Sequence, residues 1–282
     1  MPETLTLVGY ILFGEIPRFA VVAITLSLIV SSIGFGRPPW FFGVGSGLAV
    51  GAMAAATGLA YRHRLGLLAG IQLAVLIVHG TWLSAFLITR ERKPSFPRGF
   101  LARHTALPMR LGRRALVWLA VSLLYFCLFT PALYATVDRL LIIRPVTTAL
   151  QISGLSVMLA GFVLELAADT QKSMFKAYQP DACCYAGLYG WVRQPNHLGE
   201  LLFWAGNFIA GMGFFISPMH WLLAVAGLIG VLVLMGAIAL RLEESRADRY
   251  GQLEEYRQYV TRVPTLIPWM SPRRLSPGDR PD

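Results

Sequence analysis

Apolar runs long enough to cross a lipid bilayer recur along the chain, separated by polar stretches. A helix needs about 17–25 residues to span a hydrocarbon layer about 30 Å thick. Seven segments have this length and composition: residues 19–35, 41–61, 65–89, 115–137, 146–168, 200–217 and 219–240. A spanning segment must satisfy its own backbone hydrogen bonds, and an apolar run of this length does so as a helix. The pattern therefore predicts an all-α fold, a bundle of about seven transmembrane helices in a single membrane domain over residues 1–282.

The composition agrees with this prediction. The chain is 55% hydrophobic and only 14% charged, whereas a soluble domain carries about 25% charged residues. Residues 1–18 lack the basic segment that opens a removable signal peptide, so we expect the first span to be an uncleaved anchor. The three cysteines show neither a CxxC nor a Cys/His pattern, which argues against a zinc site and a disulfide framework.

The distribution of basic residues predicts the orientation. If the N-terminus lies outside, the cytoplasmic segments hold 20 Lys and Arg and the outer segments hold 5. This asymmetry follows the positive-inside rule and predicts a cytoplasmic C-terminus. Topology then explains most of the net charge of +10. We therefore expect membrane lipid as a partner, and no nucleic acid.

Three polar segments face the predicted cytoplasmic side. They are a basic linker at 90–114, a loop of about 30 residues from Asp169 to Glu200, and the tail from residue 241. The tail repeats apolar residues at helical spacing between Leu242 and Val263, which predicts a C-terminal amphipathic helix. Residues 270–282 have the composition of a disordered segment.

Two carboxylates mark the inner end of the fifth span. Glu165 and Asp169 lie one helical turn apart on one face. Placing a carboxylate deep in a span costs about 2.5–3.5 kcal/mol, so such residues usually face a cavity or a partner. The simpler interpretation is that both residues only approach the membrane interface.

The stretch RQPNHLGE at 193–200 opens the sixth span. Pro195 suits the first turn of a helix, and Asn196 and Glu200 then share one face, with His197 beside them. The free N–H groups of a helix N-terminus attract anions, but Glu200 would repel one, so it suits a hydroxyl or an amide. Helix capping with ordinary interface polarity is the alternative interpretation.

His79 lies inside the third span, with Gln72 two turns earlier on roughly the same face. A histidine in this setting is either an interhelical hydrogen-bonding residue or a functional group. The chain contains no GxGxxG after a strand, P-loop, HExxH or GxSxG motif. A nucleotide cofactor would therefore bind outside the Rossmann pattern.

Three strings resemble the C-terminal half of the steroid 5α-reductase-like membrane family, including its largely uncharacterised bacterial branch. They are GFVLELAADTQKSMFKA, GLYGWVRQPNHLGELLFWAGNFI and EEYRQYVTRVPTLIPW, which together cover about residues 160–269. FLITRERKPSF at 86–96 resembles the end of the family's third span. The usual family string is Arg-His-Pro-Asn-Tyr-x-Gly-Glu, so Gln194 and His197 are departures from it.

The resemblance implies an NADPH-dependent reductase acting on an activated C=C bond of a lipophilic, steroid-like or isoprenoid ketone. It implies a cofactor held on the cytoplasmic side, a substrate that enters from the bilayer, and a bacterial inner membrane as the location. Carried over by position, the cofactor-binding residues would be Arg92, Glu165, Asp169, Lys176, Asn196, His197, Glu200, Arg246 and Tyr250.

Other departures leave alternatives open. Steroid reductases of this family carry a Gln-Glu pair on the second span and a Tyr on the third. This chain has no Gln or Glu in the second span, and His79 lies near the position of that Tyr. His79 as the proton donor is therefore a hypothesis. The isoprenylcysteine carboxyl methyltransferase-like proteins share an Arg-His-Pro motif and a Glu pair like Glu243-Glu244, so an S-adenosylmethionine-dependent lipid or prenyl-cysteine methyltransferase is one alternative. A non-catalytic relative is another.

Overall fold

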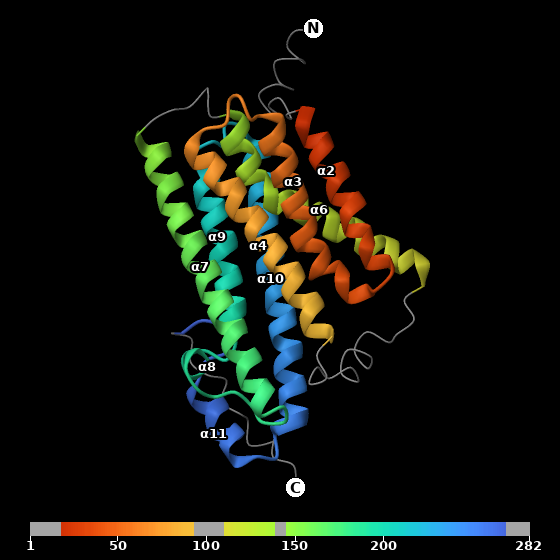
Figure 1. Cartoon of the computed structure of the whole chain (residues 1–282), viewed down its shortest axis with the longest axis vertical. Coiled ribbons are helices and arrows are strands. Elements are labelled where there is room, and N and C mark those ends of the chain that lie inside the picture. Colours follow the sequence, from red (N-terminus) through yellow and green to blue (C-terminus); the bar gives the residue numbers. More distant parts are fainter. Residues whose placement is uncertain (1–17, 93–109, 139–144, 269–282) are drawn as a thin grey trace. The chain divides into compact units, whose positions relative to one another are not determined.

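The structure, a computed structural model, describes residues 18–92, 110–138 and 145–268. Within these ranges it is helical, with no strand (Figure 1). The helices are α2 Arg18–Ser31, η1 Ser32–Phe35, η2 Pro38–Phe41, α3 Val44–Ala60, α4 Leu67–Arg92, α6 Leu111–Val137, α7 Pro145–Tyr178, α8 Leu188–Trp191, α9 Pro195–Met212, α10 Pro218–Tyr250 and α11 Glu254–Arg262. Most of the predicted basic linker and residues 270–282 lie outside the described residues.

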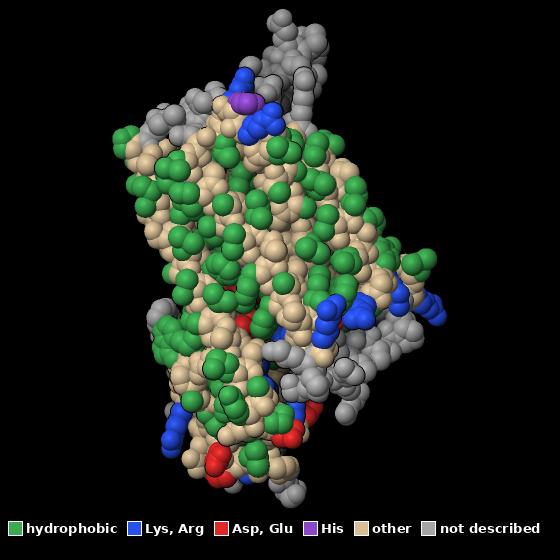
Figure 2. All heavy atoms as spheres, in the orientation of Figure 1, with side chains coloured by type: hydrophobic (Ala, Val, Ile, Leu, Met, Phe, Trp, Pro, Cys, Tyr) green, Lys and Arg blue, Asp and Glu red, His purple; other side chains and the backbone are tan. Residues whose placement is uncertain are grey.

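Five helices among the described residues are long and apolar enough to cross a membrane: Pro38–Ala60, α4, α6, α7 and α10. They match five of the predicted spans. The first predicted span corresponds to a shorter apolar helix, Phe19–Phe35, and the sixth to the 18 residues of α9. Hydrophobic side chains cover much of the visible surface of the long helices (Figure 2), as expected for lipid contact. The chain is an all-α, multi-pass membrane protein.

Two sequence predictions were wrong in detail. The expected loop from Asp169 to Glu200 is largely helical, because α7 continues to Tyr178 and α9 begins at Pro195. The expected single helix in the tail is two helices, since α10 runs on to Tyr250 and α11 starts at Glu254. Hydropathy falls at both places, but Ala, Glu, Arg, Lys and Gln are good helix formers and extend the helices past the apolar region.

The chain divides into two compact units. Unit 1 comprises residues 1–159 and 204–231, and unit 2 comprises residues 160–203 and 232–282. The chain passes from one unit to the other within α7, α9 and α10. The expectation of a single domain over 1–282 stays a prediction.

Unit 1 packs α3 against α2, α4 and α6. Glycines allow a close approach of α3 and α4, since a Cβ on Gly47 would lie 2.4 Å from the carbonyl oxygen of Gly80. In α6, Pro131 has no N–H to donate to the carbonyl of Cys127, and Thr130 Oγ1 donates to that oxygen instead, at 2.7 Å.

A buried amide network also lies in unit 1. Asn207 Nδ2 donates to the carbonyl of Leu128 at 2.9 Å, and Gln72 Nε2 donates to Asn207 Oδ1 at 2.9 Å. Hydrogen-bonding helix to helix in this way lets polar side chains occupy an apolar span.

In unit 2 the second part of α7 packs closely against the first part of α9, and glycines lie at the contact. A Cβ on Gly161 would lie 2.5 Å from the backbone nitrogen of Phe203, and one on Gly199 would lie 2.5 Å from that of Glu165. The two helices therefore touch backbone to backbone. The remaining parts of unit 2 are α8, α11 and the last turns of α10, and they carry most of the charged residues considered below.

Candidate functional site

Unit 2 contains most of the predicted site residues. Eight of the ten belong to it: Glu165, Asp169, Lys176, Asn196, His197, Glu200, Arg246 and Tyr250. His79 and Arg92 belong to unit 1, so their part in a common site stays a prediction. His79 is buried and lies edge-on to Trp204, with ring centroids 6.3 Å apart. Arg92 is exposed at the last residue of α4.

The predicted carboxylates of α7 lie beside the first turns of α9. Gly199 approaches the backbone of Glu165 and of Gly161; Asn196 lies three residues before it and Glu200 directly after it. Glu165 and Asp169 are both buried. A Cβ at position 199 would separate these helices, so the glycine of the RQPNHLGE stretch brings the two predicted groups together.

Tyr189 of α8 lies next to Asp169. Its hydroxyl donates to the carbonyl of Ala168 at 3.3 Å, and the ammonium of Lys172 lies 5.9 Å from its ring centroid. Burial, together with the negative charge of Asp169, raises the pKa of Tyr189. The phenol therefore stays protonated and acts as a neutral hydrogen-bond donor.

Lys176 holds the loop that follows α7. Its ammonium donates to the carbonyls of Pro180 at 3.0 Å and Ala182 at 2.7 Å, and to the hydroxyl of Tyr250 at 2.9 Å. An ammonium group has three protons, and all three are used here. The predicted pair Lys176 and Tyr250 is thus in direct contact. To bind a phosphate, Lys176 would have to exchange one of these bonds.

Arg193, the first residue of the RQPNHLGE stretch, anchors the tail. Its side chain is 3% exposed, and its Nε lies 2.9 Å from Glu243 Oε2. Nη1 donates to the carbonyls of Val260 at 2.9 Å and Val263 at 3.1 Å, and Nη2 donates to Thr265 Oγ1. The guanidinium group therefore satisfies carbonyl groups at the C-terminal end of α11, which have no partner within the helix.

The same cluster continues through Glu243. Arg246 Nη1 donates to Glu243 Oε1 at 3.2 Å and to the carbonyl of Arg193 at 3.0 Å. Gln194 Nε2 donates to the carbonyl of Ala239 at 3.0 Å and to Glu243 Oε1 at 3.3 Å. One carboxylate thus serves two guanidinium groups and one amide, which leaves the cluster with one positive charge in excess.

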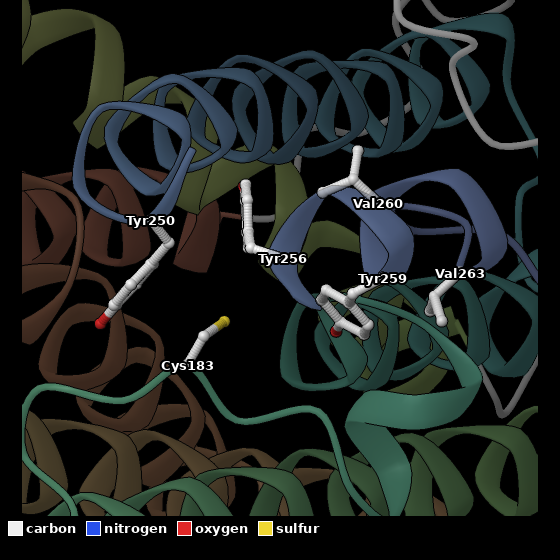
Figure 3. Close-up of a cluster of buried hydrophobic side chains, with 6 residues drawn as sticks. All are labelled: Cys183, Tyr250, Tyr256, Tyr259, Val260 and Val263. Carbon is white, nitrogen blue, oxygen red and sulfur yellow. The ribbon is translucent and has the colours of Figure 1, made fainter. Parts of the chain in front are cut away.

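Aromatic side chains surround this cluster. Cys183, Tyr250, Tyr256, Tyr259, Val260 and Val263 form one buried group (Figure 3). Tyr185 packs on it, with its ring centroid 4.8 Å from that of Tyr259. The hydroxyl of Tyr259 donates to the carbonyl of Tyr189 at 2.7 Å, which ties α11 to α8.

Burial favours the neutral form of several titratable groups in and around this aromatic cluster. It raises the pKa of Tyr256 and that of Tyr185 to about 12. Burial also raises the pKa values of Cys183 and Cys184. Since the thiolate is the reactive form of cysteine, burial disfavours the nucleophilic form of both adjacent cysteines.

Sequence reasoning missed several of these residues. It counted Arg193 and Lys172 only among the 20 cytoplasmic Lys and Arg residues that predict the orientation. It treated Tyr256 only as one of the apolar residues at helical spacing in the tail, and it assigned no role to Tyr189. The helical spacing of Tyr256 and Tyr259 was a usable signal for a shared face. No local pattern pairs Arg193 with Glu243, because 50 residues separate them in the chain.

A family model described as "Protein of unknown function (DUF1295)" matches residues 44–263. The match runs from α3 to the residue after α11 and so extends well beyond the strings that carry the resemblance. Comparison with curated proteins gave no match, and comparison with solved structures gave none either.

Proposed function

Because the chain belongs to the DUF1295 family of steroid 5α-reductase-like membrane proteins, we propose that it is an NADPH-dependent reductase. Its substrate would be a lipophilic ketone with an activated C=C bond. We further propose that unit 2 holds the cofactor on the cytoplasmic side, that the host is a bacterial inner membrane, and that the substrate arrives from the bilayer.

The observation that carries the proposal is the chemistry gathered at the start of α9. Arg193 and Arg246 share one carboxylate, Glu243, and the resulting excess of positive charge lies beside the N-terminal turn of an 18-residue helix. Helix N-termini and guanidinium groups are the usual partners of phosphates. A dinucleotide phosphate is a ligand of matching charge.

The remaining groups suit the uncharged parts of a dinucleotide. Gln194 Oε1 is buried, and no donor among the described residues reaches it; ribose and carboxamide groups carry such donors. Asp169, Asn196 and Glu200 would accept from hydroxyl or amide groups. The residues present therefore fit NADPH, which supplies a hydride when bound.

Reduction of the C=C bond also needs one proton. In this proposal His79, buried beside Trp204, delivers that proton to the enolate oxygen of the substrate. We expect His79→Ala to lose most turnover while NADPH affinity is retained. Full turnover by the variant would remove His79 from the mechanism and leave the cofactor site in place.

The decisive test is a thermal-shift titration of detergent-purified protein with NADPH and with S-adenosylmethionine in parallel. A ligand that binds only the folded state stabilises it by RT ln(1 + [L]/Kd), about 2.7 kcal/mol at 100 times Kd. We expect NADPH to raise the melting temperature and S-adenosylmethionine to leave it unchanged. The opposite result would indicate a methyltransferase, and no shift with either would indicate a non-catalytic relative.

Two variants locate the binding. Asn196→Ala and Glu200→Ala should each weaken NADPH binding, whereas Thr261→Ala, on the exposed face of α11, should not. Unchanged NADPH affinity in both site variants would place the cofactor elsewhere.

A further inference from the structure

The amide of Gln194 is fully buried, yet only one of its two ends is hydrogen-bonded. The side chain is 0% exposed, and Nε2 donates to the carbonyl of Ala239 and to Glu243 Oε1. Both partners are acceptors, since one is a backbone carbonyl and the other a carboxylate paired with Arg193 and Arg246. The amide nitrogen must therefore face α10. The amide oxygen, Oε1, then points away from α10.

The oxygen of this amide lacks a donor. No hydrogen-bond donor among the described residues reaches Gln194 Oε1, and solvent does not reach it either. Leaving a buried acceptor unpaired costs about 1–3 kcal/mol, and nearly all buried polar atoms have a partner for this reason. Since α10 takes the nitrogen side and no described residue donates to the oxygen, a donor on a bound molecule would complete the hydrogen bonding of this amide.

The surrounding charge restricts what that molecule is. Arg246 Nη1 donates to the carbonyl of Arg193, the residue before Gln194. Pro195 then begins α9, whose first turn adds the positive end of a helix dipole. A cationic donor such as an ammonium group would be repelled here. A neutral hydroxyl or amide N–H on an otherwise anionic molecule fits both the oxygen and the charge.

We propose that Gln194 is a cofactor-positioning residue whose Oε1 accepts a hydrogen bond from a neutral donor of the bound dinucleotide. The inference rests on the proposed function and deepens it. Three kinds of group on NADPH share the required chemistry: a ribose hydroxyl, the carboxamide NH₂ and the adenine NH₂. The usual family string has His at this position, and the ring nitrogens of His change their donor and acceptor roles with pH. The oxygen of Gln194 accepts at every pH, so this contact does not titrate.

The first test measures the Kd of NADPH for purified wild type and for Gln194→Met, from the quenching of tryptophan fluorescence. Met has a similar length and no hydrogen-bonding amide. We expect about a tenfold weaker Kd, the size of effect typical for one lost hydrogen bond to a buried acceptor. The matched control is Gln258→Met, because Gln258 is exposed on α11; its Kd should equal that of wild type. An unchanged Kd in Gln194→Met overturns the proposal.

The second test uses wild-type protein, so it does not depend on the folding of a variant. Kd is measured for three kinds of NADPH analogue: the reduced 3-acetylpyridine analogue, in which a methyl group replaces the carboxamide NH₂; the deamino analogue, in which an oxygen replaces the adenine NH₂; and analogues that each lack one ribose hydroxyl. One analogue should bind about tenfold more weakly than NADPH, and that analogue identifies the donor. In Gln194→Met the same analogue and NADPH should bind equally. If wild type binds every analogue as tightly as NADPH, no donor of the cofactor reaches Gln194 and the proposal is wrong.

The two proposals fail in different ways. Wild type that does not bind NADPH at all refutes the proposed function. Wild type that binds NADPH with an affinity independent of residue 194 and of every donor group refutes only the role of Gln194.

Discussion

The two units satisfy their buried polar groups in different ways. In unit 1 the partners of buried side chains are mostly backbone carbonyls of a neighbouring turn or helix: Ser27 Oγ donates to Ser122 O at 2.8 Å, and Asn207 Nδ2 to Leu128 O at 2.9 Å. These groups are neutral. In unit 2 the corresponding positions hold ions, with Arg193, Glu243 and Arg246 in one connected cluster.

The difference concerns how much each kind of buried polar group contributes to the stability of the fold. Neutral hydrogen bonds between helices stabilise a membrane protein at little expense. Buried charges require pairing, and a well-packed apolar replacement is often as stable or more stable. The net stabilisation of the fold by the ions of unit 2 is therefore expected to be small, which is compatible with the ligand-binding role proposed above. Unit 1 departs from its own pattern at Asp138, whose Oδ2 lies 3.7 Å from Nδ1 of the buried His220.

The largest effect should come from Arg193→Met in unit 2. The change leaves Glu243 with fewer cations and the carbonyls of Val260 and Val263 without their donor. Breaking one side of a buried ion pair costs about 3–5 kcal/mol. We expect a lower melting temperature and faster hydrogen exchange in residues 254–265, measured by mass spectrometry.

The control for this prediction is Arg262→Met, because Arg262 is exposed on the same tail helix. It should alter neither quantity appreciably. If Arg193→Met leaves exchange in the tail unchanged, the guanidinium group does not anchor α11.

A smaller effect should follow from Gly199→Ala, which tests the contact of α7 and α9 in unit 2. The new methyl group would lie 2.5 Å from the backbone nitrogen of Glu165, and overpacking of this kind costs about 1–3 kcal/mol. Gly236→Ala in α10 is the matched change, since no atom lies within 4 Å of its Cβ. It should be neutral or stabilise by about 0.5–1 kcal/mol. Thermal denaturation of both variants measures the contrast, and equal melting temperatures would contradict the close packing.

The smallest effect should be the pH dependence of stability that comes from Asp138, a buried acidic residue of unit 1. Burial raises the pKa of Asp138 from 3.8 to about 6. Between these values the folded state binds more protons than the unfolded state, so the free energy of unfolding falls as pH rises from about 4 through 6. His220 and Tyr134 face this carboxyl, and their rings are stacked 3.7 Å apart.

Asp138→Asn should remove this contribution. The melting temperature of wild type minus that of the variant should therefore decrease as pH rises from 4 to 7. Asp181→Asn is the control, because the Asp181 side chain is 92% exposed. A difference that stays constant with pH would show that Asp138 does not titrate in this range.

The fold was largely predictable because hydropathy and length define a membrane span. The predicted spans at 65–89 and 115–137 match α4, Leu67–Arg92, and α6, Leu111–Val137, within a few residues. The helix ends on the polar side were not predictable in this way. The helices α7 and α10 continue to Tyr178 and Tyr250, well past residues 168 and 240, where the predicted spans end.

The candidate site was predictable only where chemistry and local spacing coincide. Glu165 with Asp169, and Asn196 with Glu200, share helix faces and were found by that rule. The partners of Arg193 were not found, because a tertiary ion pair leaves no periodic trace in the sequence. Gln194 was noted as a departure from a family string, but its unpaired oxygen follows only from the position of α10.

The anchoring of the tail by Arg193 also bears on the order in which the protein is made. The guanidinium group donates its hydrogen bonds to residues that lie 67, 70 and 72 positions later in the chain. Arg193 is therefore synthesised before any of these acceptors. The hydrogen bonds that anchor the tail are complete only after residues up to Thr265 have been synthesised.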